Sequence, residues 1–330
     1  KVNTKGFDPE LRAVKGLQPF NFKDRQAVLD EMKNEFDISH WFLAKAGDLL
    51  ENIFTYDMPM IYQVKGCNFH QGGEIDGCVP CYVDNESNSG NPDKGVYLSV
   101  KNIVDSFQRM NKERGTKVIR TSGGEPTLVL EHLLALYKEL ESRGVKPILA
   151  QFDTNLSTGH LIDHLEKEGV LEKNILGKIA EYDPKLLVAF KGTSDEGIRQ
   201  NIQAVCSVDE QVYSLKKIVE AGLDVYPYIY NPDPETFEGF MGKLQETFPN
   251  ILPRIHIGLL KMYTPTKQRI NLLAQKYNVD PAQLTASYES TWAANYKAAC
   301  KIMDELCQKQ YGVQYKEIPR VETERVKVKV

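Results

Sequence analysis

Residues 60–82 read MIYQVKGCNFHQGGEIDGCVPCY, a short β-rich run followed at once by a glycine-rich loop with three cysteines. The apolar and β-branched residues at its start predict a strand over Met60 to Lys65. Ten residues separate Cys67 from Cys78, and Cys78 forms a CxxC pair with Cys81. Thiolates are soft ligands, and a CxxC pair lets two sulfurs face one metal centre from a tight turn. The stretch therefore predicts a strand that leads directly into a zinc or iron–sulfur site.

Beyond this loop, β-rich runs alternate with amphipathic helical stretches. The further predicted strands are Lys117–Arg120, Pro147–Phe152, Leu186–Lys191, Asp224–Tyr230 and Arg254–Lys261. The predicted helices between them are Val100–Glu113, Val129–Arg143, His160–Glu168, Asp195–Ala204, Val212–Ala221 and Pro234–Thr247. This alternation favours parallel βα units, in either an open Rossmann-type sheet or a partial barrel. The glycine pattern of a dinucleotide turn is absent after the first strand, which weighs against the Rossmann fold.

The chain is predicted to be one core with helical extensions at both ends. Residues 1–58 are expected to form an N-terminal arm and helices, residues 59–265 the βα core, and residues 266–330 a C-terminal helical extension and tail. The apolar stretches are too short to cross a bilayer and the start has no signal-peptide pattern, so we expect a cytoplasmic protein that does not enter a membrane. The net charge of −4 gives no general attraction to a polyanion.

The cysteine loop alone leaves two kinds of metal site open. A structural zinc ion takes four protein ligands, and His70 would complete a Cys3His set with Cys67, Cys78 and Cys81. An iron–sulfur cluster held by three cysteines would instead leave one iron open to a further ligand. The remaining cysteines are scattered, so a disulfide framework is not expected. The choice between zinc and a cluster has to come from elsewhere in the chain.

A second motif follows the next predicted strand, where residues 117–127 read KVIRTSGGEPT. Glycines let a backbone approach a ligand closely, and a carboxylate pairs with a cation. A lone GGEP would be weak evidence, since glycine and proline are common in turns. Placed one βα unit after a three-cysteine loop, however, it resembles the radical S-adenosylmethionine (SAM) superfamily. That resemblance implies that Gly123, Gly124 and Glu125 line the methionine end of SAM and receive its ammonium group.

The resemblance covers roughly Met60 to Lys261 and implies both a fold and a cofactor. The fold is a partial (β/α)6 TIM-like barrel of the radical SAM type with helical N- and C-terminal extensions. The cofactor is a [4Fe-4S] cluster on Cys67, Cys78 and Cys81, with SAM at its open iron. The usual cysteine spacing in this family is CxxxCxxC, so residues 68–77 are interpreted as containing an insertion at the loop tip.

Three more positions carry residues that the resemblance assigns to SAM. Tyr82 follows the third cysteine, where the family often has an aromatic residue near the adenine. Asp153 to Asn155 resemble the Asp-Thr-Asn-Gly segment of glycyl-radical activating enzymes, with Leu156 in place of the glycine. Lys191 resembles the lysine that reaches the SAM carboxylate in those enzymes, although Ala189 stands where they have an aspartate. Taken alone, Asp153 to Asn155 would better suit a helix N-cap or an Asx turn, and Tyr82 would equally suit core packing.

All of these residues are expected at the carboxyl ends of parallel strands, where barrel enzymes assemble their active sites. The resemblance implies that an electron from a flavodoxin or ferredoxin cleaves SAM to a 5′-deoxyadenosyl radical, which abstracts hydrogen from a substrate. Three classes of substrate are compatible with the sequence, namely a glycine of a partner protein, a small molecule and a tRNA base. The sequence also leaves open a non-enzymatic zinc module.

Overall fold

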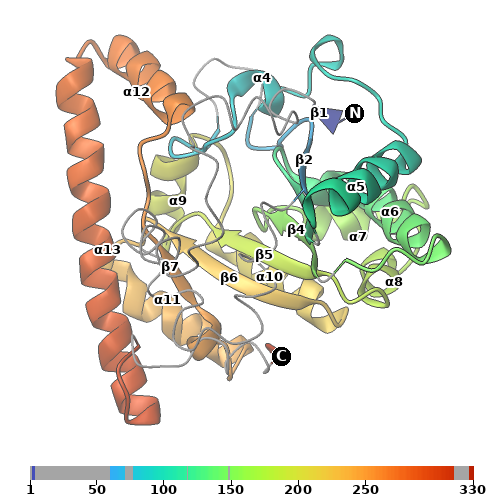
Figure 1. The fold of residues 1–330 in the computed structure, drawn as a ribbon. Coiled ribbons are helices and arrows are strands. Elements are labelled where there is room, and N and C mark those ends of the chain that lie inside the picture. The colour runs from blue at the N-terminus through green and yellow to red at the C-terminus, as the bar shows by residue number, and fades with distance from the viewer. Residues whose placement is uncertain (1, 4–59, 71–76, 117, 148, 316–326) are drawn as a thin grey trace.

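The computed structural model describes residues 2–3, 60–70, 77–116, 118–147, 149–315 and 327–330. A seven-stranded sheet runs through it in the order β1 to β7 (Figure 1). The short strand β1 (Val2–Asn3) pairs antiparallel with β2 (Met60–Val64), and β2 to β7 are all parallel. The remaining strands are β3 (Val118–Ser122), β4 (Leu149–Thr154), β5 (Lys185–Phe190), β6 (Asp224–Tyr230) and β7 (His256–Gly258).

The parallel strands follow one another in chain order without a reversal. A doubly wound Rossmann sheet reverses its strand order at a switch point, so that alternative is wrong for this chain. Successive right-handed βα units that add strands in one direction produce a partial barrel. The predicted α/β partial (β/α)6 barrel is therefore confirmed.

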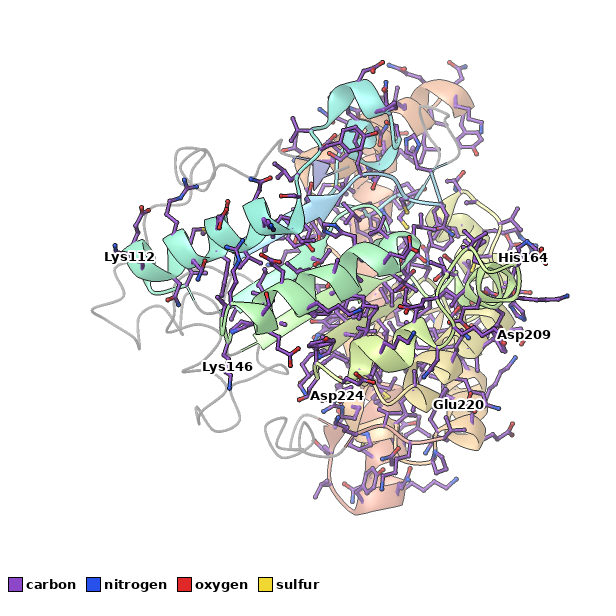
Figure 2. The ribbon with its side chains drawn as sticks, turned by 90° about the vertical axis from the view of Figure 1, so that its right-hand side faces the viewer. Lys112, Lys146, His164, Asp209, Glu220 and Asp224 are labelled. Atoms are coloured by element: carbon purple, nitrogen blue, oxygen red, sulfur yellow. The ribbon has the colours of Figure 1, made fainter. Side chains whose placement is uncertain are left out.

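Helices connect the strands. In chain order they are α4 (Asn85–Asn88), α5 (Val100–Arg114), α6 (Leu130–Ser142), α7 (Gly159–Lys167), α8 (Ile175–Ala180), α9 (Asp195–Ile202), α10 (Val208–Glu220) and α11 (Pro234–Thr247). Short 3-10 helices occupy Pro92–Lys94, Pro126–Val129 and Leu252–Arg254. Helices α5 and α6 run side by side, and the exposed Lys112 lies at the outer end of α5 (Figure 2). Gly115 adopts φ 73° and caps α5, as its place after the last periodic turn predicted.

Several elements differ from the prediction in extent or existence. Strand β7 is only three residues long, because Leu252–Arg254 form a 3-10 helix and Arg254 turns its side chain into the core. Helix α8 was not expected, since its six residues are too few to show a helical period. The predicted helices before Met60 lie outside the described residues.

The two faces of the sheet differ in polarity. Side chains that alternate along each strand bury apolar groups against the helices, among them Tyr62, Phe152, Val188 and Ile229. The intervening positions carry polar and aromatic groups. Ser122 is buried, and the others are only partly buried, namely Gln63, Arg120, Gln151, Asp153, Tyr228 and Tyr230. The inner face of the partial barrel is therefore a polar surface.

Helices α12 (Thr264–Tyr277) and α13 (Pro281–Tyr311) form a C-terminal hairpin beside the sheet (Figure 1). The hairpin has a small core of its own, formed by Ile270, Leu273 and Trp292. Val79, from the middle of the CxxC pair, completes that core. The extension is thus packed directly against the cysteine loop. No helix in the described residues has both the length and the apolar character needed to cross a membrane.

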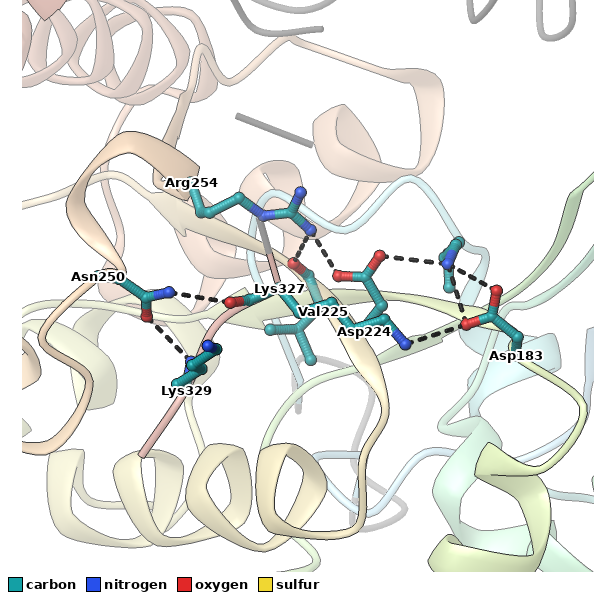
Figure 3. A network of polar contacts seen from close by, with 8 residues as sticks. Asp183, Asp224, Val225, Asn250, Arg254, Lys327 and Lys329 are labelled. Atoms are coloured by element: carbon teal, nitrogen blue, oxygen red, sulfur yellow. Dashed lines mark hydrogen bonds and ion pairs between the residues drawn. The ribbon is translucent and has the colours of Figure 1, made fainter. Parts of the chain in front are cut away.

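A polar network ties strands β5 and β6 together at their amino ends, opposite the cysteine loop (Figure 3). Asp224 and Arg254 are almost fully buried and pair at 2.8 Å, and Lys185 approaches Asp224 at 3.2 Å. Asn250 bonds the carbonyl oxygen of Lys327 and the amide of Lys329. The C-terminal residues are thereby fastened to this edge of the barrel.

Candidate functional site

The three cysteines lie in the loop between β2 and α4, and all three are free and partly buried. The amide of Cys67 donates to the carbonyl oxygen of Asn88 at 2.9 Å, so the first cysteine is fixed against the end of α4. The amide of Cys81 donates to the carbonyl oxygen of Cys78 at 3.1 Å, which closes the tight CxxC turn. The side-chain amide of Asn88 also approaches Sγ of Cys81 at 3.7 Å.

The thiols share one electrostatic environment. Burial, followed by repulsion from Cys78 and Glu125, raises the pKa of Cys67 to about 12. Burial also raises the pKa of Cys78, whereas the positive charges of Lys191 and Arg269 oppose that shift. Two cations from other parts of the chain, Lys191 and Arg269, therefore lie close to the cysteine loop. Cationic neighbours favour the thiolate form that a metal requires.

The donor set of the loop consists of the three cysteine thiols. Among the described residues, no three His, Cys, Asp or Glu side chains converge as the ligands of one metal ion. A zinc ion would gather all its sulfurs at about 2.3 Å. The described side chains therefore show no preformed site for either a zinc ion or a cluster, and the choice between the two rests on the donor chemistry. Three soft sulfurs on one loop, with amide groups beside two of them, are the donor chemistry of an iron–sulfur cluster.

The glycines of the GGEP motif pack against the start of the cysteine loop. The φ angles of Gly123 and Gly124 are 64° and 56°, a region that favours glycine. A Cβ on Gly124 would lie 2.2 Å from the carbonyl oxygen of Gly66, and one on Gly123 would lie 2.6 Å from the Gln63 side chain. The packing of these glycines against Gly66 and Gln63 therefore leaves no room for a side chain at either position. Contact between the glycines and a ligand stays a prediction.

Glu125 is buried and its carboxylate bridges two loops. Oε1 accepts from the amide of Thr127 at 3.1 Å and from its hydroxyl at 2.5 Å. Oε2 accepts from the amide of Asn155 at 2.7 Å. Burial raises the pKa of Glu125, and these hydrogen bonds oppose the shift. The side chain thus fixes the loop after β3 to the loop after β4, a role that the sequence did not reveal.

Asn155 connects the two motifs. Its amide binds Glu125, and its side-chain Nδ2 lies 3.7 Å from Sγ of Cys67 and 3.0 Å from Oδ1 of Asn68. The next residue, Leu156, adopts φ 58° and is fully buried. Its backbone thus takes a conformation that favours glycine, and its buried side chain offsets the strain. The structure therefore brings Asn155 together with both Cys67 and Glu125.

Asp153 is directed toward the inner face of the barrel and binds Arg120 with both carboxylate oxygens. It also accepts from Ser122 at 2.6 Å and from Gln151 at 3.0 Å. Of the predicted site residues it reaches Tyr82, but only through Ser122, which bonds the Tyr82 hydroxyl at 2.8 Å. The structure thus places Asp153 in a polar network with Arg120, Ser122 and Gln151. The sequence did not indicate these partners.

Tyr82 and Lys191 complete the set of predicted residues. Tyr82 is 45% exposed and makes an edge contact with Tyr263, so its ring is not buried in the hydrophobic core. The ammonium group of Lys191 lies 5.4 Å from the ring centroid of Tyr230. Burial would lower the pKa of Lys191, but attraction to Cys78, to Tyr230 and to the other thiols raises it. Lys191 is thus a firmly charged cation facing the cysteine loop.

Arg269 is the site residue that sequence reasoning missed. It lies on α12, outside the βα core, and its guanidinium donates to the carbonyl oxygens of Cys81 and Val83. Thr266 on the same helix face approaches the Cys81 oxygen at 3.4 Å. The only signal in the sequence is the helical spacing of Thr266, Arg269 and Ile270, which marks a buried face without naming its partner.

The sequence model of the radical SAM superfamily matches residues 61–244. The chain belongs to the radical SAM superfamily. Membership implies a [4Fe-4S] cluster and SAM as cofactors and a reductant for the cluster. The matched segment contains the cysteine loop, the GGEP motif, Asn155 and Lys191, and it ends before Arg269.

Several solved structures resemble this radical SAM chain at low identity. The cobalamin-dependent S-adenosylmethionine radical enzyme OxsB is 12% identical, with a TM-score of 0.46 over 67% of this chain and 36% of that one. A mutant of spore photoproduct lyase is 17% identical, with a TM-score of 0.42 over 66% of this chain and 61% of that one. The chain thus spans about a third of the length of OxsB. No curated protein matches it.

Proposed function

We propose that this chain holds a [4Fe-4S] cluster on Cys67, Cys78 and Cys81 and cleaves SAM reductively to generate a 5′-deoxyadenosyl radical that abstracts hydrogen from a substrate. The observation that carries the proposal is the position of Asn155, which binds Glu125 through its backbone and contacts Cys67 through its side chain. One residue therefore links the cysteine loop to the GGEP loop. A structural zinc knuckle would not require that link.

The cluster, when bound, supplies the electron that breaks a carbon–sulfur bond of SAM, and the protein supplies the geometry. Lys191 provides a charged ammonium group for the SAM carboxylate, and the backbone of Gly123 to Glu125 faces the methionine ammonium. Tyr82 offers a partly exposed ring to the adenine, and Asn155 holds the loop that the ligand would contact. These residues orient the cofactor beside the cluster and help to exclude water.

Two of the proposed SAM contacts have a structural role as well. The Glu125 carboxylate already accepts three hydrogen bonds from Thr127 and Asn155, which leaves little of its acceptor capacity for the ammonium group. Asp153 is paired with Arg120, and a contact with SAM would require it to share that pairing. We therefore propose that Glu125 and Asp153 act chiefly by shaping the site, while Lys191 makes the stronger contact with the ligand.

The left-handed conformation at Leu156 favours an activating enzyme for a glycyl-radical protein as a second candidate. The backbone there has the geometry that the glycine of the Asp-Thr-Asn-Gly segment would adopt without strain. Ala189 counts against this candidate, because it lacks the carboxylate at that position. A small molecule and a tRNA base remain as other substrate classes, with a flavodoxin or ferredoxin as the electron donor.

Anaerobic reconstitution with iron and sulfide tests the proposal. The dithionite-reduced protein should give a [4Fe-4S]+ signal in electron paramagnetic resonance that changes when SAM is added, and 5′-deoxyadenosine should be released. Cys78→Ser should abolish the signal, whereas Cys300→Ser, on α13, should leave it intact. A wild-type protein that binds one zinc ion, no iron and no SAM would overturn the proposal.

A further inference from the structure

Arg269 is buried to 2% exposure beneath the cysteine loop, although arginine is among the residues least often buried. One guanidinium nitrogen donates to the carbonyl oxygen of Cys81 at 2.5 Å, and another donates to that of Val83. The fork of the guanidinium therefore holds the carbonyl oxygens of Cys81 and Val83, two residues apart at the end of the CxxC pair. This contact joins positions 188 residues apart in the sequence.

The charge of this buried group calls for a negative partner. A guanidinium remains charged in proteins, and burying a charge is costly unless it is paired. Two backbone carbonyls accept hydrogen bonds from two of its nitrogens but carry no net charge. Within the described part of the chain no carboxylate forms an ion pair with Arg269. Among the described residues, the thiol of Cys78 lies within electrostatic reach of Arg269.

An iron–sulfur cluster would supply that missing charge. Three thiolates around a [4Fe-4S]2+ core leave a net negative charge, and one-electron reduction increases it. Net charge and hydrogen bonding around a cluster are among the factors that set its reduction potential. A fixed cation beside the loop therefore stabilises the reduced form more than the oxidised form.

We propose that Arg269 is a positioning residue for the cluster, holding the peptide of Cys81 in place and raising the reduction potential of the cluster through its buried positive charge. This inference rests on the proposed function, because it requires the cluster to form on the cysteine loop. It adds a role for the C-terminal hairpin, which lies outside the segment matched to the superfamily.

The packing of the hairpin supports this role independently of the charge. Val79, within the CxxC pair, is buried against Ile270, Leu273 and Trp292 of α12 and α13. Helix α12 thus contacts the loop in two ways. Ile270 and Leu273 pack against Val79, and Arg269 donates a hydrogen bond to the carbonyl oxygen of Cys81. The hairpin fixes the distance between the guanidinium and the second and third cysteines.

The test is a redox titration of reconstituted protein, monitored by electron paramagnetic resonance without SAM, together with iron and sulfide content per chain. Arg269→Gln should lower the midpoint potential, and Arg269→Lys should keep it near the wild-type value because the charge remains. Lys267→Gln is the matched control, since it removes one exposed positive charge from the same helix and should leave the potential unchanged.

Each outcome is decisive. An Arg269→Gln protein that holds a cluster with the wild-type midpoint would overturn the inference while leaving the proposed function intact. If that variant assembles no cluster, Arg269→Lys decides: a cluster with a near wild-type midpoint supports the role of the charge, and failure to assemble one overturns it. A wild-type protein that assembles no cluster at all would instead refute the proposed function.

Discussion

The backbone amide of Glu125 donates a 2.8 Å hydrogen bond to the carbonyl oxygen of Gly66, the residue immediately before the first cysteine. This bond joins the loop after β3 to the loop after β2, so the two motifs of the family form one rigid unit. Displacing either loop should therefore disturb the other. Five predictions about the site and the fold can be tested separately.

Replacing Gly124 with alanine should disrupt this unit. The new Cβ would lie 2.2 Å from the Gly66 oxygen at φ 56°, so the protein should lose about 2 kcal/mol or more of unfolding free energy and bind less iron. Urea denaturation and iron analysis measure both effects. Gly239→Ala on α11 is the control, because its Cβ would meet nothing within 4 Å and should be neutral or stabilising. Equal behaviour of the two variants would contradict the proposed packing.

Removing the charge of Lys191 should weaken SAM binding while the cluster remains. Loss of one charge-assisted hydrogen bond is worth about 1.5–3 kcal/mol, so Lys191→Ala should raise the Kd of SAM roughly 10- to 100-fold. Anaerobic calorimetry with reconstituted protein gives the Kd. The exposed Lys243, on α11, provides the control Lys243→Ala. An unchanged Kd in Lys191→Ala would remove this residue from the proposed ligand set.

The ring of Tyr82 should matter more than its hydroxyl. Tyr82→Phe loses the hydrogen bond to Ser122 but keeps the aromatic face, so SAM affinity should change little. Tyr82→Ala loses the face, and an aromatic contact worth about 0.5–1.5 kcal/mol corresponds to a loss of roughly 2- to 12-fold in affinity. The same SAM titration compares the two variants. If both bind SAM like the wild type, Tyr82 has no part in adenine recognition.

His70→Ala separates the cluster from the zinc alternative. Because the proposed cluster uses only cysteine ligands, the variant should retain the iron and sulfide content of the wild type after reconstitution. A Cys3His zinc site would lose one of its four ligands and most of its metal affinity. Metal analysis by mass spectrometry distinguishes the two results. Loss of all metal in His70→Ala would favour zinc.

The ion pair at the opposite edge of the barrel should govern stability rather than cofactor binding. Asp224→Ala leaves Arg254 buried without its carboxylate partner, which should cost about 3–5 kcal/mol. Asp183→Ala removes an exposed partner of Lys185 and Lys327 and should cost less than about 1 kcal/mol. Chemical denaturation measures both, and similar costs would show that burial of the pair is unimportant.

Local sequence patterns determined the architecture and the place of the site. Alternating β-rich runs and amphipathic helices predicted the parallel units, because strand and helix periods are properties of short segments. Parallel strands place their carboxyl ends at one edge, so Cys67, Glu125, Asn155 and Lys191 could be predicted to meet there. The domain limits at residues 58 and 265 stay predictions, as do the contacts of these residues with SAM.

Only the tertiary structure decided which partner each polar side chain has. The sequence could not indicate that Glu125 binds Asn155, or that Asp153 pairs with Arg120, because these contacts cross from one βα unit to another. Still less could it connect Arg269 to Cys81, since the hairpin brings the arginine back across the whole barrel. Periodicity marks a face as buried, but the identity of its neighbour depends on long-range packing that no local pattern encodes.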